Sequence, residues 1–352
     1  MYTKLYYLQE AKTGANLKVE PHHRIALSTM KIDLSRAAVD PPGVIEEVTV
    51  DQPLPTTVSL QDVGPRDGFQ FEKKIVPTDR KLAVIARLVA AGLKQVQVAS
   101  FVHPHKVPQM ADAERLIQQL PDLKDVVYSA LVLNQRGLER ALASGIQAVE
   151  ISLSASDTHS RKNAGRSHAD ALDQGLRMIR QAATAGVQVR ASLQCAFGCV
   201  FEGQIGVDRI AAIIGRFVDH GAHVLALADT TGMGSPPQIG RVLNRVLPRA
   251  GRLPLAMHLH DTRGLGLVNL MTALTYGVTQ FDTALAGMGG CPFVPGAAGN
   301  IATEDTAHLL ETLGIHTGVD YRQIAALSYE LETFFGTCFA GRMHRVMMGR
   351  AP

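Results

Sequence analysis

Short apolar and β-branched runs alternate with longer amphipathic segments from residue 56 onward. Runs of about four to eight such residues indicate buried strands, whereas apolar residues spaced three and four apart indicate helices that pack along one face. The pattern predicts eight strands, at residues 57–62, 95–100, 126–133, 148–155, 188–195, 223–229, 255–260 and 281–286. It predicts helices between them at residues 79–91, 112–119, 135–143, 169–185, 207–220, 237–247 and 267–276, and two more at 303–313 and 321–335.

The order of these elements favours an α/β protein built as a closed (β/α)8 TIM barrel, because eight β-α units follow one another between residues 57 and 286. Glycine stands after several predicted helices, as at Gly92, Gly186 and Gly277, where it is the usual residue. No Gly-x-Gly-x-x-Gly follows the first strand, which counts against a dinucleotide-binding fold. The last two helices are expected to pack outside the barrel.

The first 52 residues differ from the rest and are predicted to form an N-terminal extension, partly ordered at best, ahead of a barrel domain at 53–352. They mix Lys, Glu, His and Pro without a sustained period and contain the turn Pro41-Pro42-Gly43. The segment has no signal-peptide pattern, and Glu10, Glu20 and Asp33 argue against a mitochondrial presequence. Met30 is a candidate for an alternative start.

Composition and charge indicate an ordinary globular protein, with 46% hydrophobic and 19% charged residues and a net charge of +3. We expect neither nucleic acid nor a membrane as a partner, because the chain has no Lys/Arg block and no apolar window of about 18 residues. The four cysteines, Cys195, Cys199, Cys291 and Cys338, are too few for a disulfide framework. Cys195 and Cys199 have no matching second pair for structural zinc, so we expect a reducing, cytoplasmic location.

Two histidines, His258 and His260, stand two residues apart at the end of the seventh predicted strand. Residues i and i+2 of a strand share a face, so the two imidazoles would lie side by side and could bind a divalent cation. A polar pair at a sheet edge is the alternative.

The segment Gly64-Pro65-Arg66-Asp67-Gly68 follows the first strand and predicts a tight turn that lets backbone approach a ligand. Asp67 offers a carboxylate oxygen, and Arg66 offers a cation with a planar fork of donors. A surface turn with an Arg–Asp pair is the alternative.

The glycine-rich segment 287–300, which follows the last strand, predicts a mobile loop that closes over a substrate. Cys291 lies near its centre, and its glycine neighbours argue against the common role of cysteine as a small buried hydrophobe. Asn300 offers a neutral amide oxygen.

These residues share one property, since all follow or end predicted strands, and the chemistry of such barrels lies where strands end. The candidate metal ligands are Asp67, His258, His260 and Asn300. This mixed set of nitrogen and oxygen donors favours Mg²⁺ or Mn²⁺ with open coordination positions over a closed thiolate zinc site.

Over residues 56–340 the chain resembles the 3-hydroxy-3-methylglutaryl-CoA lyase family, which belongs to the barrel metallolyases and Claisen-type synthases. The resemblance rests on the motifs at 63–68 (VGPRDG), 100–102 (SFV), 107–112 (VPQMAD), 198–199 (GC), 202–203 (EG), 258–262 (HLHDT), 289–292 (GGCP) and 299–305 (GNIATED). The GGCP loop separates the lyases from the related synthases.

The resemblance implies a metal-dependent retro-Claisen cleavage of a 3-hydroxy-3-methylglutaryl-CoA-like acyl-CoA to acetyl-CoA and a 3-oxo acid, as in leucine degradation. The cation would lower the pKa of the tertiary hydroxyl, Arg66 would stabilise the enolate, and Cys291 would protonate its carbon. Asp67 and His258 also belong to the implied catalytic set. The implied contacts with the acyl-CoA, which carries coenzyme A as part of the substrate, are Gln70, Lys73, Gln97 and Asp229. A homo-oligomer is expected.

Two departures from the family pattern bear on the substrate. Gln97 and Asp62 each stand where the lyases generally carry glutamate. Gln97 is either a neutral replacement or a sign that the site has one negative charge fewer and accepts a different acyl group or turns over slowly. On the second interpretation Gln97→Glu should raise cleavage.

Several functions therefore stay open. The chain is a lyase for a related acyl-CoA, the standard lyase tolerating Gln97, or a weakly active CoA-binding relative that serves as a scaffold or regulator. The intact set of ligands with Arg66 and Cys291 argues against the last. The cysteine loop argues against a Claisen synthase.

Overall fold

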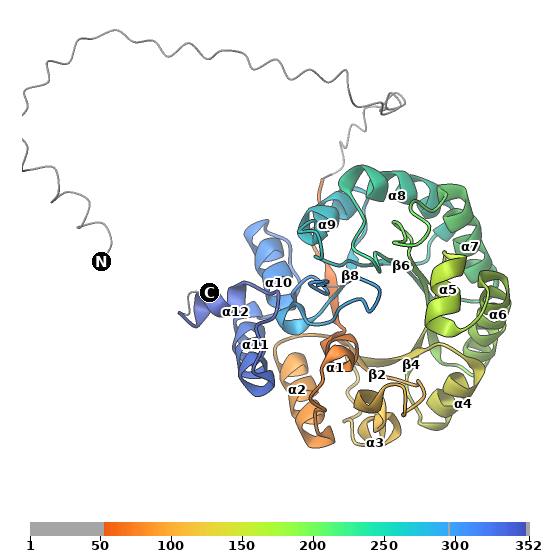
Figure 1. Cartoon of the computed structure of the whole chain (residues 1–352). Coiled ribbons are helices and arrows are strands. Elements are labelled where there is room, and N and C mark those ends of the chain that lie inside the picture. Colours follow the sequence, from red (N-terminus) through yellow and green to blue (C-terminus); the bar gives the residue numbers. More distant parts are fainter. Residues whose placement is uncertain (1–52, 295, 350–352) are drawn as a thin grey trace, which may run out of the picture. The chain divides into compact units, whose positions relative to one another are not determined.

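Eight parallel strands close into a barrel in the computed structural model, which describes residues 53–294 and 296–349 (Figure 1). They are β1 (Ser59–Asp62), β2 (Gln95–Ser100), β3 (Val127–Val132), β4 (Ala148–Ser154), β5 (Gln188–Gln194), β6 (Val224–Ala228), β7 (Leu255–His258) and β8 (Gln280–Thr283). Each strand pairs with its sequence neighbours, and β1 pairs with β8 to close the ring. The (β/α)8 barrel is thus confirmed; the extension predicted at 1–52 lies outside the described residues.

Helices surround the barrel between successive strands (Figure 1). The larger ones are α2 (Thr78–Ala90), α3 (Ala113–Gln118), α4 (Gln135–Ala143), α5 (Asp157–Ala164), α6 (His168–Thr184), α7 (Val207–Asp219), α8 (Pro236–Ala250), α9 (Gly266–Thr275), α10 (Thr303–Thr312) and α11 (Tyr321–Phe335). The short pieces are η2 (Gly64–Gly68), α1 (Phe69–Phe71), η3 (Pro108–Met110), η4 (Leu285–Gly287) and α12 (Met343–Met347). Among the described residues, no helix combines the length and apolar character needed to cross a bilayer.

One helix, α5, has no counterpart among the predicted elements. Its sequence has almost no apolar residues, and only His159 and Ser160 are buried in it, so it gives no amphipathic signal. Local hydrogen bonds define its ends instead: the Ser156 hydroxyl accepts from the backbone N–H of His159, and Gly165 ends it in a left-handed conformation. This helix lies over the cavity described below.

The strands are buried on both faces, which explains their nearly continuous apolar runs. In β4 every residue is buried: Val149 and Ile151 are fully buried in the hydrophobic core, while Glu150 and Ser152 alternate with them. Across the barrel interior, the buried polar side chains include Gln61, Gln97, Glu150, Arg190 and Asp282. The barrel therefore holds charged groups at its centre, and these support the site above them.

Candidate active site

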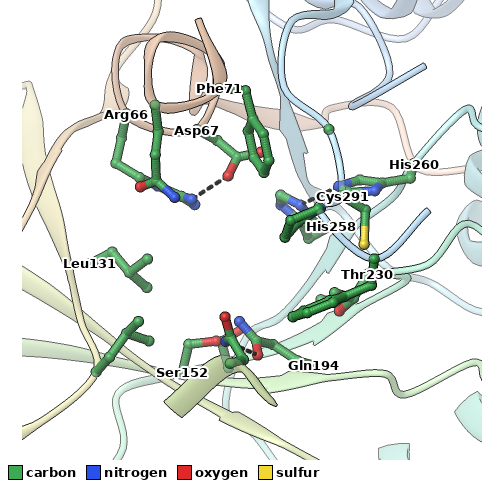
Figure 2. A pocket seen from close by; sticks show the side chains of 18 of the residues that line it. Arg66, Asp67, Phe71, Leu131, Ser152, Gln194, Thr230, His258, His260 and Cys291 are labelled. Atoms are coloured by element: carbon green, nitrogen blue, oxygen red, sulfur yellow. Dashed lines mark hydrogen bonds and ion pairs between the residues drawn. The ribbon is translucent and has the colours of Figure 1, made fainter. Parts of the chain in front are cut away.

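A cavity of about 740 Å³, including space open to solvent, lies at the carboxyl-terminal ends of the strands (Figure 2). Six residues predicted from the sequence line it: Arg66, Asp67, Gln70, His258, His260 and Cys291. Side chains from opposite ends of the chain therefore meet in one place.

Arg66 and Asp67 are delivered by the segment that follows β1. Residues Gly64–Gly68 form one wide helical turn instead of the predicted tight turn. A Cβ atom on Gly64 would lie 2.0 Å from Leu285 Cδ2, so glycine here allows close packing against the segment after β8 rather than approach to a ligand. The turn leaves Arg66 and Asp67 buried but facing the cavity.

Three metal-ligating side chains converge beside this turn. Ligand atoms of Asp67, His258 and His260 all lie within 4.8 Å of one another. The Nε2 atoms of the two histidines are 3.1 Å apart. Strand β7 ends at His258, and an antiparallel bridge between His260 and Asn300 continues the extended backbone. Two imidazole nitrogens that face each other beside a carboxylate are arranged as donors to a shared cation.

Asn300 completes the same cluster. Its Nδ2 donates to Asp67 Oδ2 at 2.7 Å and to the backbone oxygen of Met288 at 2.9 Å. Its Oδ1 is buried and has no hydrogen-bond partner among the described residues, a costly state that a bound ligand would relieve. Imidazole, carboxylate and amide donors fit a hard or borderline divalent cation with some coordination positions left open.

His258 is held by a chain of charged groups from the barrel interior. Asp282 Oδ2 lies 3.1 Å from His258 Nδ1 and accepts from Arg190 Nη2 at 2.7 Å. Burial lowers the pKa of His258, but the hydrogen bond and charge of Asp282 outweigh burial and raise it overall. Orientation through the remote ring nitrogen is typical of metal-binding histidines.

His260 and Asp67 are poised in the protonation states that a metal requires. Burial, together with the charge of His258, lowers the pKa of His260 to about 3 and keeps the ring neutral. Burial by itself raises the pKa of Asp67, but Arg66 and the two histidines lower it below its usual value. The carboxylate therefore stays ionised.

A second chain of contacts holds Arg66. Its Nε donates to Gln97 Oε1, and its Nη1 pairs with Asp67. Gln97 Nε2 in turn donates to Glu150 Oε2 at 2.8 Å, and Glu150 lies 3.5 Å from Arg190. A carboxylate is thus present beside Gln97 in this wall of the site, since Glu150 accepts from the Gln97 amide; that the site has one negative charge fewer than in the family stays a prediction.

Cys291 lines the cavity but is buried, with 7% of its surface exposed, contrary to the expectation from its glycine neighbours. Burial raises the pKa of its thiol, so the thiol is protonated near neutral pH. The burial of Cys291 is explained by Phe293, two residues further along the loop. The Phe293 ring packs edge-on against His159 at 5.1 Å and Phe201 at 5.6 Å. These contacts hold the described part of the loop over the cavity.

The four predicted acyl-CoA contacts lie in different settings. Gln70 lines the cavity, and Lys73 is exposed and does not line it. Gln97 is fully buried with both amide atoms engaged, and Asp229 accepts from the backbone N–H groups of Met233 and Gly234. Burial raises the pKa of Asp229 to about 6. The structure therefore places Gln97 and Asp229 behind the cavity wall, where they support other residues.

Asp62, the other departure from the family pattern, anchors the turn that carries Arg66. It accepts from the backbone N–H of Gly64 at 2.8 Å and from the Thr303 hydroxyl at 2.6 Å. Burial is the main reason that the pKa of Asp62 rises to about 7. Its place is structural, between the first strand and α10.

Sequence reasoning missed part of the cavity wall. The missed polar residues include Glu150, Ser152, Ser192 and Gln194. The sequence did contain an indication of these residues. Polar residues at every second position of a predicted strand are expected to face the interior of a closed barrel. Arg190 and Asp282 behind the wall carry the same signal.

Comparison with known proteins agrees with this geometry. The family model described as HMGL-like matches residues 57–330. A hydroxymethylglutaryl-CoA lyase of Bacillus subtilis is 38% identical over 81% of this chain and 95% of its own length. The mitochondrial hydroxymethylglutaryl-CoA lyase of Bos taurus is 40% identical over 77% of this chain and 83% of its own length.

A solved structure supports the same relation. The HMG-CoA lyase of Acinetobacter baumannii, in complex with coenzyme A and 3-methylmalate, superposes with a TM-score of 0.79 at 35% identity, covering 82% of this chain and 95% of that one. The motif spacing, the barrel and the convergent side chains agree with these matches. The chain therefore belongs to the hydroxymethylglutaryl-CoA lyase family of carbon–carbon lyases.

Proposed function

We propose that this protein cleaves a 3-hydroxy-3-methylglutaryl-CoA-like thioester to acetyl-CoA and a 3-oxo acid, with a divalent cation bound by Asp67, His258, His260 and Asn300. The observation that carries the proposal is the convergence of three of these ligands within 4.8 Å, next to Asn300, whose amide nitrogen donates to Asp67 at 2.7 Å and whose amide oxygen has no partner among the described residues. When bound, Mg²⁺ or Mn²⁺ supplies Lewis-acid chemistry that makes a substrate hydroxyl easier to deprotonate.

Arg66 is the residue placed to stabilise negative charge. Asp67 and Gln97 fix its guanidinium from two sides, so it faces the cavity without having to reorganise. Breaking the bond between C2 and C3 of the substrate leaves an enolate on the thioester, and a preorganised cation next to that oxygen lowers the barrier. This placement supports Arg66 as the oxyanion-stabilising residue.

Cys291 is the candidate proton donor. Its thiol is protonated because burial raises its pKa, and it lines the cavity that holds the metal-ligating residues. Delivery of this proton to C2 would convert the enolate to acetyl-CoA. Phe293, which lines the cavity and packs against His159 and Phe201, would help to shield that carbon from bulk water.

The test is direct. Purified protein is incubated with 3-hydroxy-3-methylglutaryl-CoA and related 3-hydroxyacyl-CoA thioesters, with Mg²⁺, Mn²⁺ or EDTA, and acetyl-CoA release is followed. We expect cation-dependent release that falls by a factor on the order of 10³ in Arg66→Gln and is retained in Arg252→Gln, an exposed arginine before β7. A folded protein that releases no acetyl-CoA from any thioester would overturn the proposal.

A further inference from the structure

The wall across the cavity from the metal-ligating residues is polar, as Figure 2 shows for Ser152 and Gln194. Ser152 on β4 and Ser192 on β5 are register partners, so their side chains stand next to each other on the inner face of the barrel. Gln194 follows two residues later on the same face. We call Ser152, Ser192 and Gln194 the polar shelf.

The hydroxyl groups of the polar shelf have no hydrogen-bond partner in the part of the chain that the structure describes. Ser152 and Ser192 are 7% and 2% exposed, and neither side chain hydrogen-bonds to another described residue. Both residues line the cavity, unlike Ser328 in α11, whose unpaired hydroxyl is sealed from solvent. Gln194 Oε1 accepts from Asn163 at 3.3 Å, which leaves its Nε2 donor free of the described residues. Donors and acceptors of the polar shelf are therefore available to form hydrogen bonds with a ligand in the cavity.

Such a surface discriminates between substituents on a bound substrate. A methyl group pressed against two buried hydroxyls would expel their water and leave them unpaired, which is unfavourable. A hydroxyl group can donate to one serine and accept from the other. The shelf thus favours a substituent that forms hydrogen bonds.

The charges of the residues beneath the polar shelf indicate that this substituent is uncharged. Glu150 and Arg190, the register partners two residues earlier, lie directly below it, and Arg190 also pairs with Asp282 at 2.7 Å. One guanidinium thus lies between two carboxylates. A carboxylate substituent would be repelled there, and the serine hydroxyls offer no compensating cation.

We propose that the polar shelf binds a hydroxyl-bearing substituent at C3, so that the preferred substrate carries a hydroxymethyl-type group where 3-hydroxy-3-methylglutaryl-CoA carries methyl. This inference rests on the proposed function. The C3 hydroxyl loses its proton, the C2–C3 bond breaks, and its electron pair moves to C2 as the thioester enolate while C3 becomes a ketone. Cys291 protonates C2, and the proton released from the hydroxyl restores the thiol. The products are acetyl-CoA and 4-hydroxy-3-oxobutanoate.

The experiment compares kcat/KM for 3-hydroxy-3-(hydroxymethyl)glutaryl-CoA and 3-hydroxy-3-methylglutaryl-CoA. We expect the hydroxymethyl compound to be preferred by about tenfold or more. In the double variant Ser152→Ala/Ser192→Ala this ratio should fall by about tenfold or more, whereas Ser328→Ala should keep the ratio of the parent. Each change removes a single oxygen atom, and thermal unfolding checks that the fold is retained.

The outcomes separate the two proposals. Cleavage of the methyl compound without preference for the hydroxymethyl compound overturns the shelf assignment and leaves the proposed function standing. A preference that survives the double variant also overturns the shelf assignment. Cleavage of neither compound overturns the shelf assignment, and it overturns the proposed function as well if no other thioester of the panel releases acetyl-CoA.

Discussion

Two histidines in this protein, the half-buried His258 and the buried His344, are paired with carboxylates in similar ways but in different settings. His258 has Asp282 at one ring nitrogen and His260 at the other, and it faces the cavity. His344, on α12, has Glu304 3.0 Å from Nδ1 and Glu332 3.0 Å from Nε2, and it lines no described cavity. In both histidines, carboxylates outweigh burial and raise the pKa.

The difference shows what makes such a pair a site. His344 has a carboxylate 3.0 Å from each ring nitrogen, so it joins α12 to α10 and α11 inside the protein. His258 uses one partner for orientation and turns its other nitrogen toward a second imidazole and Asp67. A free donor atom and an open cavity, rather than a perturbed histidine alone, distinguish the candidate active site.

The strongest test of this comparison is Asp67→Asn. Loss of the charged ligand should lower kcat/KM for acetyl-CoA release by a factor on the order of 10³, while the fold persists because Asn is isosteric. Steady-state kinetics and thermal unfolding measure the two effects. A variant with parental kcat/KM would show that Asp67 is a structural residue like Glu304.

The converse change, His344→Ala, should act on stability alone. Removing the histidine leaves Glu304 and Glu332 without their shared partner, and loss of one member of a buried pair costs about 3 kcal/mol. Urea unfolding measures this loss, with the exposed His316→Ala as the control. If kcat/KM of the folded variant dropped a hundredfold, the separation of the two histidines would be wrong.

Gln97→Glu should change kcat/KM for acetyl-CoA release less than Asp67→Asn does. The contact between Gln97 and Glu150 leads us to expect a decrease, whereas the sequence alone suggested an increase. The new carboxylate would stand where Gln97 Nε2 now donates to Glu150 at 2.8 Å, and two adjacent carboxylates repel. We expect kcat/KM to fall about tenfold, with recovery in Gln97→Glu/Glu150→Gln, which moves the charge from β4 to β2. A single variant faster than the parent would support the earlier expectation.

The smallest effect concerns pH. The pKa of His344 is raised in the folded protein, so its stabilising contribution is complete below the ordinary histidine pKa and is lost as pH rises through the folded value. The difference in unfolding free energy between the parent and His344→Ala should therefore shrink as pH rises above the ordinary histidine pKa. A difference that grows with pH would contradict the assignment.

Much of the barrel was predictable because its signals are local. Apolar runs and glycines after helices fix strands and helices within a few residues, and the order of β-α units places Asp67 and His258 at one rim. Glu150 and Ser152 were not found, because their role depends on which strand face turns inward when the barrel closes. The burial of Cys291 was not predicted for a similar reason, since it depends on Phe293 packing against residues far away in sequence.

Diffraction from crystals of the full chain grown with Mn²⁺, recorded at a wavelength where manganese scatters anomalously, tests the central claim most directly. One peak should lie about 2.2 Å from Asp67, His258 Nε2, His260 Nε2 and Asn300 Oδ1. Manganese bound at another place, or no peak beside these four side chains at saturating Mn²⁺, would contradict it.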